Sequence, residues 1–174
     1  PMDRSLQSPL QPEVQPPPYL HLVRKIDELE ITVRTSNCLH RSGIRFLGEL
    51  VQKSEQELLL IPNSGLKTLN EVKEILSGFK LQLGQPITNW PPRNLEQLSL
   101  RVDNLLEPVE YLELSIRTAN CLRDETIQFV GELVQISEDD MLKKRNFGQK
   151  SLNELNEILA EMGLEFGIEL PHLI

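Results

Sequence analysis

Aromatic residues and histidines are scarce in this protein of 174 residues. Phe, Trp and Tyr together make up 5% of the sequence, and only three histidines, His21, His40 and His172, are present. A core must therefore be built mainly from Leu, Ile and Val. The histidines are scattered and recur at no equivalent position, whereas a metal needs clustered ligands. We therefore expect no metal site and no cofactor.

Cysteines and long apolar runs are also few. The two cysteines, Cys38 and Cys121, hold the same place in two similar segments, which weighs against a disulfide between them. No apolar stretch approaches the roughly 20 residues that are needed to cross a bilayer. No charged and then apolar leader opens the sequence. These absences favour a cytoplasmic protein.

The sequence contains two closely similar segments, residues 29–84 and 112–167. The first begins LEITVRTSNCL and the second LELSIRTANCL, at a constant offset of 83 residues and without a gap. A unit of this length is too long for a solenoid repeat and suits a small domain. The protein is therefore predicted to be a tandem of two folds.

Proline and glutamine dominate residues 1–20, which predicts a tail with no core of its own. A Pro-rich recognition ligand is less favoured, because no basic residue flanks the prolines. We place a first module at 21–92, a linker at 93–104 and a second module at 105–174. Trp90 is expected to pack on the first module. The leucines of the linker suit one or two helical turns, so the modules are expected to be held together.

Helical periodicity runs through both modules. Apolar residues recur at intervals of three and four, and we expect four or five short helices in each copy and no strand. The predicted fold class is all-α. Thr35 or Ser36, and Thr118 in the second copy, can cap the first helix, and Ser54 with Glu57 has the pattern of a capping box.

A short segment that we call the hairpin segment, NSGLKT at 63–68 and NFGQKS at 146–151, recurs in both copies. Its glycine is expected to take a positive φ, and its hydroxyl residue to cap the next helix. The free amides of that helix and the adjacent lysine would form a site for one phosphate. A plain helix-turn-helix corner with a solvated lysine is the alternative. The residues concerned are Gly65, Lys67 and Thr68, and in the second copy Gly148, Lys150 and Ser151.

An arginine that precedes an asparagine by three residues opens the first helix of each copy. Arg34 and Asn37 form this pair in the first copy, and Arg117 and Asn120 in the second. Arginine and asparagine side chains can contact a groove or a phosphate, although a solvated arginine is the commoner case at any single site. Recurrence together with the hairpin segment favours a nucleic-acid site.

Both copies resemble the C-terminal domain of the bacterial RNA polymerase alpha subunit, over essentially each whole module. The resemblance rests on RTSNCL and RTANCL, on GELVQ, on the hairpin segments and on NWPP after the first copy. In that family the domain has a helix-hairpin-helix-like motif and grips the minor groove of A+T-rich upstream promoter DNA. It also contacts activators and the promoter-recognition factor. A nucleoid-associated bacterial protein is therefore expected.

The resemblance implies equivalent DNA-binding residues in the two copies. They are Arg34, Asn37, Cys38, Gly65, Lys67, Thr68 and Glu71 in the first, and Arg117, Asn120, Cys121, Gly148, Lys150, Ser151 and Glu154 in the second. The family's acidic surface for the promoter-recognition factor is matched by Asp27, Glu28 and Glu30. In the second copy it is altered to Glu110, Tyr111 and Glu113.

The family's large N-terminal assembly domain has no counterpart in this sequence. The protein is therefore either a free-standing tandem or a fragment of a longer alpha-like protein. Enzymatic activity is not expected, because Glu71 and Glu154 lack a paired carboxylate, a nucleophile or a metal set, and suit orienting or capping roles better.

Net charge distinguishes the two copies. The formal charge of the whole sequence is −8. Residues 29–84 hold seven basic and six acidic side chains, and residues 112–167 hold six and eleven. Negative charge opposes nonspecific DNA binding, so we expect the first module to bind DNA better. Lys143, Lys144 and Arg145 could compensate locally in the second.

The sequence is compatible with three functions. The leading one is a transcription-associated, non-enzymatic protein that binds A+T-rich promoter DNA with both modules. The alternative is a protein-interaction module that mimics alpha and occupies polymerase, the promoter-recognition factor or activators, with little DNA binding. A DNA-repair accessory fits the hairpin segment but not the NCL and NWPP motifs. Neither a membrane nor a small-molecule substrate is expected.

Overall fold

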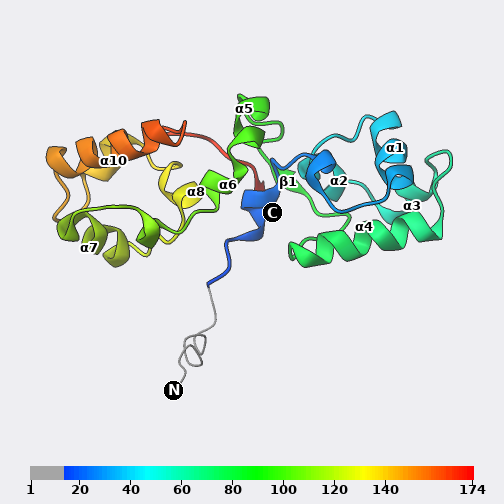
Figure 1. The fold of residues 1–174 in the computed structure, drawn as a ribbon, viewed down its shortest axis with the longest axis horizontal. Coiled ribbons are helices and arrows are strands. Elements are labelled where there is room, and N and C mark those ends of the chain that lie inside the picture. Colours follow the sequence, from blue (N-terminus) through cyan, green and yellow to red (C-terminus); the bar gives the residue numbers. More distant parts are fainter. Residues whose placement is uncertain (1–13) are drawn as a thin grey trace, which may run out of the picture.

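The two copies form similar helical modules at the two ends of an elongated molecule (Figure 1). The structure, a computed structural model, describes residues 14–174, so most of the predicted tail lies outside the described residues. The first module contains the short 3-10 helices η2 (Pro18–His21) and η3 (Ile26–Glu28), and the helices α1 (Val33–Arg41), α2 (Leu47–Val51), α3 (Glu55–Leu59) and α4 (Leu66–Gly78).

The second module repeats this order of helices. It contains η4 (Val109–Tyr111), α7 (Ile116–Asp124), α8 (Val130–Leu133), α9 (Glu138–Leu142) and α10 (Gln149–Glu161). Between α4 and η4 in the sequence lie the strand β1 (Ile87–Thr88) and the helices α5 (Leu95–Leu100) and α6 (Val102–Leu105), and the last element is β2 (His172–Leu173). The predicted mostly helical architecture is confirmed. The two-residue strands were not expected, because such short segments carry no detectable alternation.

The first helix of each module begins earlier than the sequence suggested. Thr32 caps α1 and Ser115 caps α7, each by accepting a hydrogen bond from the amide three residues later. The prediction that Thr35, Ser36 or Thr118 provides the cap is therefore wrong. All three lie inside their helices. The capping box at Ser54 and Glu57 is confirmed.

Each module has its own apolar core. In the first, Leu39, Leu47 and Leu76 are among the fully buried side chains, and Leu122, Leu133 and Leu159 hold equivalent or similar places in the second. Leu, Ile and Val dominate both clusters, as the scarcity of aromatic residues predicted. Packing of one face of each short helix against this cluster stabilises helices that would be marginal alone.

The second core also contains residues from outside the predicted second module. Leu98, Val102 and Leu105, from α5 and α6, are buried in it. The segment assigned to a linker therefore folds as part of the second module and is not a free tether. The expected helical turns in this segment are present.

The end of the predicted tail is buried in the second core as well. Leu20 is 1% exposed and belongs to the second cluster, although it lies next in sequence to the first module. It packs so closely on Gly131 that a Cβ at that glycine would overlap its methyl groups. Leu20 is thus held against a core that lies far along the sequence, and local sequence carries no sign of such a contact.

Trp90 packs on the first module, as predicted, and also contacts the second core. Its ring lies edge-on to Phe46, with centroids 6.2 Å apart, and covers Gly48 so closely that a Cβ there would overlap it. Gly48 and Gly131 are equivalent positions in the two copies. Each module therefore uses the same glycine to admit a large apolar group at the junction.

Polar contacts join the modules at the same place. The strand β2 pairs antiparallel with β1, with Ile87 opposite Leu173 and Thr88 opposite His172. The His172 ring stacks on Tyr19 at 4.1 Å between centroids. Gln135 donates a hydrogen bond of 2.8 Å to the Tyr19 hydroxyl. The predicted close association of the modules thus has a physical basis.

Within residues 14–174, no helix combines the length and the apolar character that crossing a membrane would require.

Candidate nucleic-acid interface

The hairpin segment reverses direction at an asparagine. Asn63 has a φ of 67° and Asn146 a φ of 61°, both in the left-handed region that asparagine tolerates better than most residues. Gly65 and Gly148 have φ of −148° and −128°, which is extended backbone. The prediction of a positive φ at these glycines is therefore wrong.

The helix after each turn begins without a side-chain cap. Gly65 and Gly148 are the N-cap residues of α4 and α10, and neither has a side-chain atom that could accept a hydrogen bond. In contrast, side-chain oxygens cap α1, α3, α7 and α9. The first amides of α4 and α10 therefore point outward as donors at the positive end of a helix dipole.

The hydroxyl residues of the hairpin segment have a different role from the predicted one. Thr68 and Ser151 lie inside the first turn of α4 and α10 and are only 7% and 6% exposed. The Ser151 hydroxyl accepts a hydrogen bond of 2.8 Å from Thr118 on α7. The prediction that they cap the helices is wrong, because the glycine already occupies the N-cap position.

Glu71 and Glu154 join the two helices of the interface. Glu71 on α4 accepts hydrogen bonds from the Thr32 amide at 2.6 Å and from the Thr32 hydroxyl at 3.1 Å. Glu154 on α10 does the same with the amide and hydroxyl of Ser115. The carboxylate thus occupies the N-terminus of the first helix, as a capping role requires. It also fixes that helix against the hairpin segment.

The pKa values of these glutamates reflect two opposing effects. Burial raises the pKa of Glu71, but the hydrogen bonds from Thr35 and Thr32 outweigh it, and the pKa lies below the ordinary value of 4.5. Burial and hydrogen bonds from Ser115 and Thr118 act on the pKa of Glu154 in the same way. Both groups are therefore charged at neutral pH.

Glu71→Gln is expected to lower the free energy of unfolding by about 1–2 kcal/mol at pH 7, because the amide directs an N–H at donors. A carboxyl whose folded-state pKa is lowered stabilises the fold above its unfolded pKa, and this contribution is lost as the pH falls through the folded pKa. The deficit of the variant should therefore narrow below pH 4.5. Urea unfolding of the wild type and the variant at a series of pH values measures this difference in the free energy of unfolding.

The exposed Glu74 on the same helix provides the control. Glu74→Gln should change stability by less than about 0.5 kcal/mol at any pH. A Glu71→Gln deficit that stays constant down to acid pH would contradict the proposed role of the charge.

The cysteines pack beneath the interface. Cys38 is 3% exposed, and its thiol donates to the Asn63 carbonyl at 3.3 Å. Cys121 is equally buried and donates to the Arg145 carbonyl at 3.6 Å. Neither forms a disulfide. These residues hold the first helix against the turn, and their burial prevents a direct contact with a large ligand.

The remaining predicted residues form an exposed set around each uncapped helix. Hydrogen bonds of Glu71 or Glu154 to the cap of the first helix, and of the buried cysteine to the turn, join the helix that carries the arginine and the asparagine to the helix that carries the lysine. The residues of this set are Arg34, Asn37 and Lys67 in the first module, and Arg117, Asn120 and Lys150 in the second. The structure thus separates the predicted set into accessible groups and buried supports.

Internal hydrogen bonds distinguish the two sets. Arg117 donates to the Asn146 carbonyl at 3.4 Å, and Arg123 donates to the Asn120 side-chain oxygen at 2.9 Å. Within residues 14–174, the equivalent arginine and asparagine of the first module make no such bonds. The first module therefore presents these groups to solvent with less internal competition.

The basic run before the second hairpin segment is partly neutralised. Lys143 lies 3.5 Å from Asp140 and Lys144 lies 2.9 Å from Glu125. Arg145 is exposed. The local compensation that the sequence suggested is therefore smaller than the count of basic residues implies.

The predicted protein-contact surface of the first module already makes contacts within the protein. Asp27, Glu28 and Glu30 are exposed. Asp27 pairs with His40, and Glu28 pairs with Arg24 at 3.3 Å. Only part of this acidic surface is therefore available to a partner without the loss of an internal contact.

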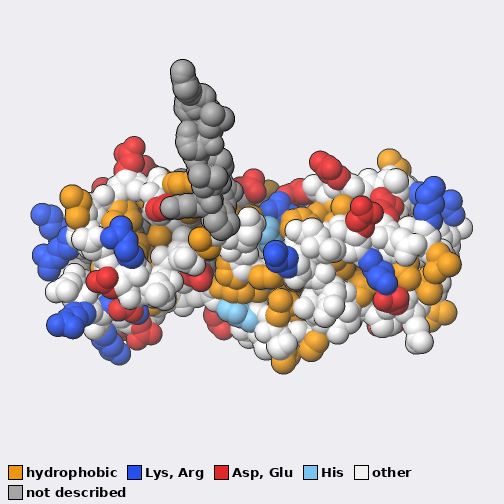
Figure 2. Space-filling model, turned by 90° about the horizontal axis from the view of Figure 1, so that it is seen from below, with side chains coloured by type: hydrophobic (Ala, Val, Ile, Leu, Met, Phe, Trp, Pro, Cys, Tyr) orange, Lys and Arg blue, Asp and Glu red, His pale blue; other side chains and the backbone are white. Residues whose placement is uncertain are grey.

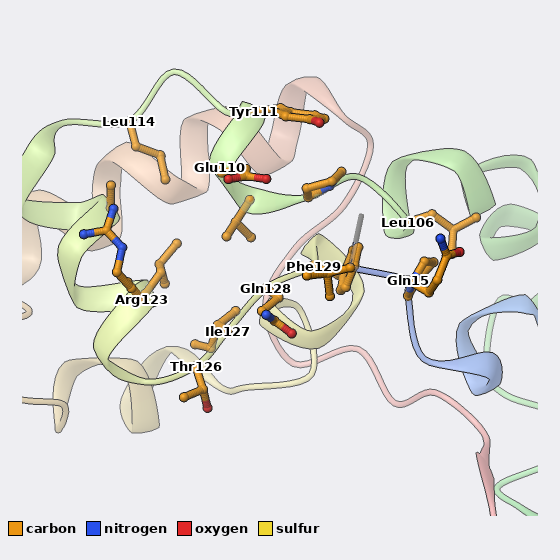
Figure 3. A pocket seen from close by; sticks show the side chains of 16 residues that line it. Gln15, Leu106, Glu110, Tyr111, Leu114, Arg123, Thr126, Ile127, Gln128 and Phe129 are labelled. Carbon is orange, nitrogen blue, oxygen red and sulfur yellow. The ribbon is translucent and has the colours of Figure 1, made fainter. Parts of the chain in front are cut away.

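In the second module the positions of Asp27 and His40 are taken by Glu110 and Arg123. Both line an open groove of about 610 Å³ (Figure 3). Tyr111, which is 65% exposed, and residues 14–16 line it as well. The groove is therefore a second exposed feature, distinct from the hairpin segment.

Sequence reasoning missed two pairs of residues in this interface. Thr32 and Ser115 cap the first helix and donate hydrogen bonds to the glutamate, and Asn63 and Asn146 form the turn. The asparagines could have been found, because asparagine is among the residues that tolerate a positive φ best after glycine.

Comparison with known proteins relates both modules to one family. The family model for the C-terminal domain of the bacterial RNA polymerase alpha chain matches twice, at residues 18–78 and 96–161. Among solved structures, the protein is similar to the C-terminal domain of the RNA polymerase alpha subunit from Helicobacter pylori, determined by NMR. The two share 30% sequence identity over 59% of this protein and 89% of that one, with a TM-score of 0.37.

Proposed function

This protein belongs to the family of C-terminal domains of the bacterial RNA polymerase alpha chain, of which it holds two copies, and we propose that each copy grips the minor groove of A+T-rich promoter DNA. Membership supports a transcription-related, DNA-binding role. The finer proposal is that the arginine of each exposed set enters the groove while the uncapped helix holds a phosphate. We further propose that the protein acts on nucleoid DNA and is not an enzyme.

One observation carries this proposal. In both modules an exposed arginine and asparagine on the first helix and an exposed lysine on the helix after the turn accompany a helix N-terminus that has no side-chain acceptor at its cap. Free amides and a helix dipole favour a phosphate, and an arginine is the usual residue in a narrow A+T-rich minor groove. The buried cysteine and hydroxyl and the partly buried glutamate hold these groups in place, so little order has to be created on binding.

The first module is proposed to bind DNA more tightly than the second. Its repeat unit is nearly neutral, whereas that of the second is acidic. Arg34 and Asn37 are also less engaged within the protein than Arg117 and Asn120. Both observations favour the first module for contact with a polyanion.

Titration of the full-length protein against an A+T-rich and a G+C-rich duplex tests the proposal. We expect tighter binding to the A+T-rich duplex, because its minor groove is narrower and more negative. Affinity should fall between about 50 and 200 mM salt, as a few phosphate contacts release counterions. Fluorescence anisotropy measures both effects. Equal binding to both duplexes would reject minor-groove recognition and leave only a charge effect.

A protein-interaction role is the second candidate, and the groove of the second module favours it. The groove lies at the position equivalent to the acidic surface around Asp27, and Tyr111 is exposed at its edge. Capture of purified polymerase or promoter-recognition factor, without measurable binding to any duplex, would favour this role over DNA binding.

A further inference from the structure

The modules are joined as one body. Apolar contact is provided by Leu20, which fills a place in the second core, and by Trp90, which packs against both cores. The β1–β2 pairing and the stack of Tyr19 on His172 add directional contacts at the same junction. Because the contact involves a buried core residue and a backbone pairing, the modules cannot turn independently without exposing apolar surface.

Ion pairs extend this junction. Lys25 and Arg45 of the first module both pair with Glu96 of α5, at 3.1 and 3.6 Å, and Arg24 lies 3.7 Å from Asp103 of α6. These contacts reinforce the fixed arrangement. They also neutralise basic side chains near the middle of the molecule, where a continuous track for DNA would need free positive charge.

The two hairpin segments lie at opposite ends of this body. In Figure 1, α4 begins at the outer end of the first module and α10 at the outer end of the second, and both helices run inward to the junction. Figure 2 shows Lys and Arg side chains gathered at both ends of the molecule. The two proposed DNA-binding surfaces therefore lie at opposite ends of the molecule.

One short duplex cannot easily reach both ends. A spherical protein of this size is on the order of 40 Å across and this elongated one is longer, whereas the persistence length of DNA is about 50 nm. The N-termini of α4 and α10, which are proposed to hold phosphate, face outward in opposite directions, so a duplex that contacted both would have to curve around the protein. The free energy of such sharp DNA bending must be offset by contacts with an extensive positive surface. The basic residues at the junction are already paired with acidic residues and do not form such a surface.

We infer that this protein bridges two DNA segments, with one duplex held at each end of the rigid tandem. This inference rests on the proposed function, since it requires that each module binds DNA. It goes further in assigning to the tandem an activity that a single module or a flexible pair would not have.

A two-duplex capture experiment tests the inference with the full-length protein. A biotinylated A+T-rich duplex of about 20 base pairs is fixed on beads, and a fluorescent duplex of the same sequence is added with the protein at low salt. We expect retention of the fluorescent duplex to rise at least about tenfold over the protein-free level. Retention should fall again at excess protein, because each duplex then carries its own protein molecule.

Two variants distinguish bridging by one molecule from bridging by associated molecules. Arg34→Ala and Arg117→Ala should each reduce retention of the fluorescent duplex, because each weakens one end. Lys53→Ala, which lies outside both hairpin segments, should retain it as the wild type does. Undiminished capture by Arg117→Ala would show that the bridge arises from self-association and would overturn the inference.

Anisotropy with a single duplex separates this inference from the proposed function. Binding of one duplex without capture of a second would overturn bridging and leave DNA binding intact. Failure to bind even one duplex would overturn both.

Discussion

Arg34→Ala should weaken binding of the protein to an A+T-rich duplex by about 1–3 kcal/mol, or about 5- to 150-fold. Arg34 is exposed on the first turn of α1, which the hydrogen bonds of Glu71 to Thr32 join to the uncapped helix α4. The neighbouring residues are held by hydrogen bonds within the protein, so no other side chain can move to replace the lost groove contact. Fluorescence anisotropy at constant salt measures the change.

Arg41 offers a matched control on the same helix. It is exposed at the last turn of α1, about 10 Å along the helix axis from Arg34. Arg41→Ala removes the same charge and should weaken binding far less than Arg34→Ala. If the two variants bind equally, the motif contributes only generic charge, and the minor-groove proposal loses its main support.

The second module should show a smaller effect. Arg117 is already engaged with the Asn146 carbonyl, and its module is acidic. Arg117→Ala is therefore expected to weaken binding to a single duplex less than Arg34→Ala does. A larger effect from Arg117→Ala would reverse the proposed order of the two modules.

Leu20→Ala should lower the free energy of unfolding by about 2–5 kcal/mol. The leucine is almost completely buried and lies directly on the backbone of Gly131. Alanine would leave a cavity at the junction, because the backbone of α8 is held by its own core and cannot collapse far. Denaturant unfolding of the full-length protein, followed by circular dichroism, measures the loss.

Leu60→Ala is the appropriate control, since Leu60 is 81% exposed. It should change stability by less than about 0.5 kcal/mol. A similarly small change for Leu20→Ala would mean that the junction contributes little, and the treatment of the two modules as one body would then fail.

The sequence alone was sufficient for the repeated parts of this protein. Apolar residues at intervals of three and four specify the helices, and the constant offset of 83 residues specifies two equivalent folds. The residue types of the interface could also be identified from the sequence, because arginine, asparagine, lysine and glutamate recur together in both copies. These features are local, and local spacing determines them.

The roles of individual polar residues inside the interface depend on where each helix begins, which local spacing does not determine. Helix α1 begins earlier than the sequence predicted, so Thr32 and not Thr35 caps it. Helix α4 also begins earlier, so Thr68 lies inside it. The positive φ fell on Asn63 and not on Gly65 for the same reason. Several polar residues at each helix start could serve as caps, and in the structure Thr32 caps α1 while its amide and hydroxyl both bond Glu71 on α4.

The relation between the modules was decided entirely by tertiary structure. Leu20 precedes the first module and enters the core of the second, and His172 and Leu173 return to pair with β1. These contacts join residues that are far apart in sequence, so no periodicity or spacing records them. The sequence determined that there are two modules, and which helices and interface residues each module contains. Packing at the junction alone placed their hairpin segments at opposite ends, because burial of Leu20 and Trp90 fixes one orientation of the two cores.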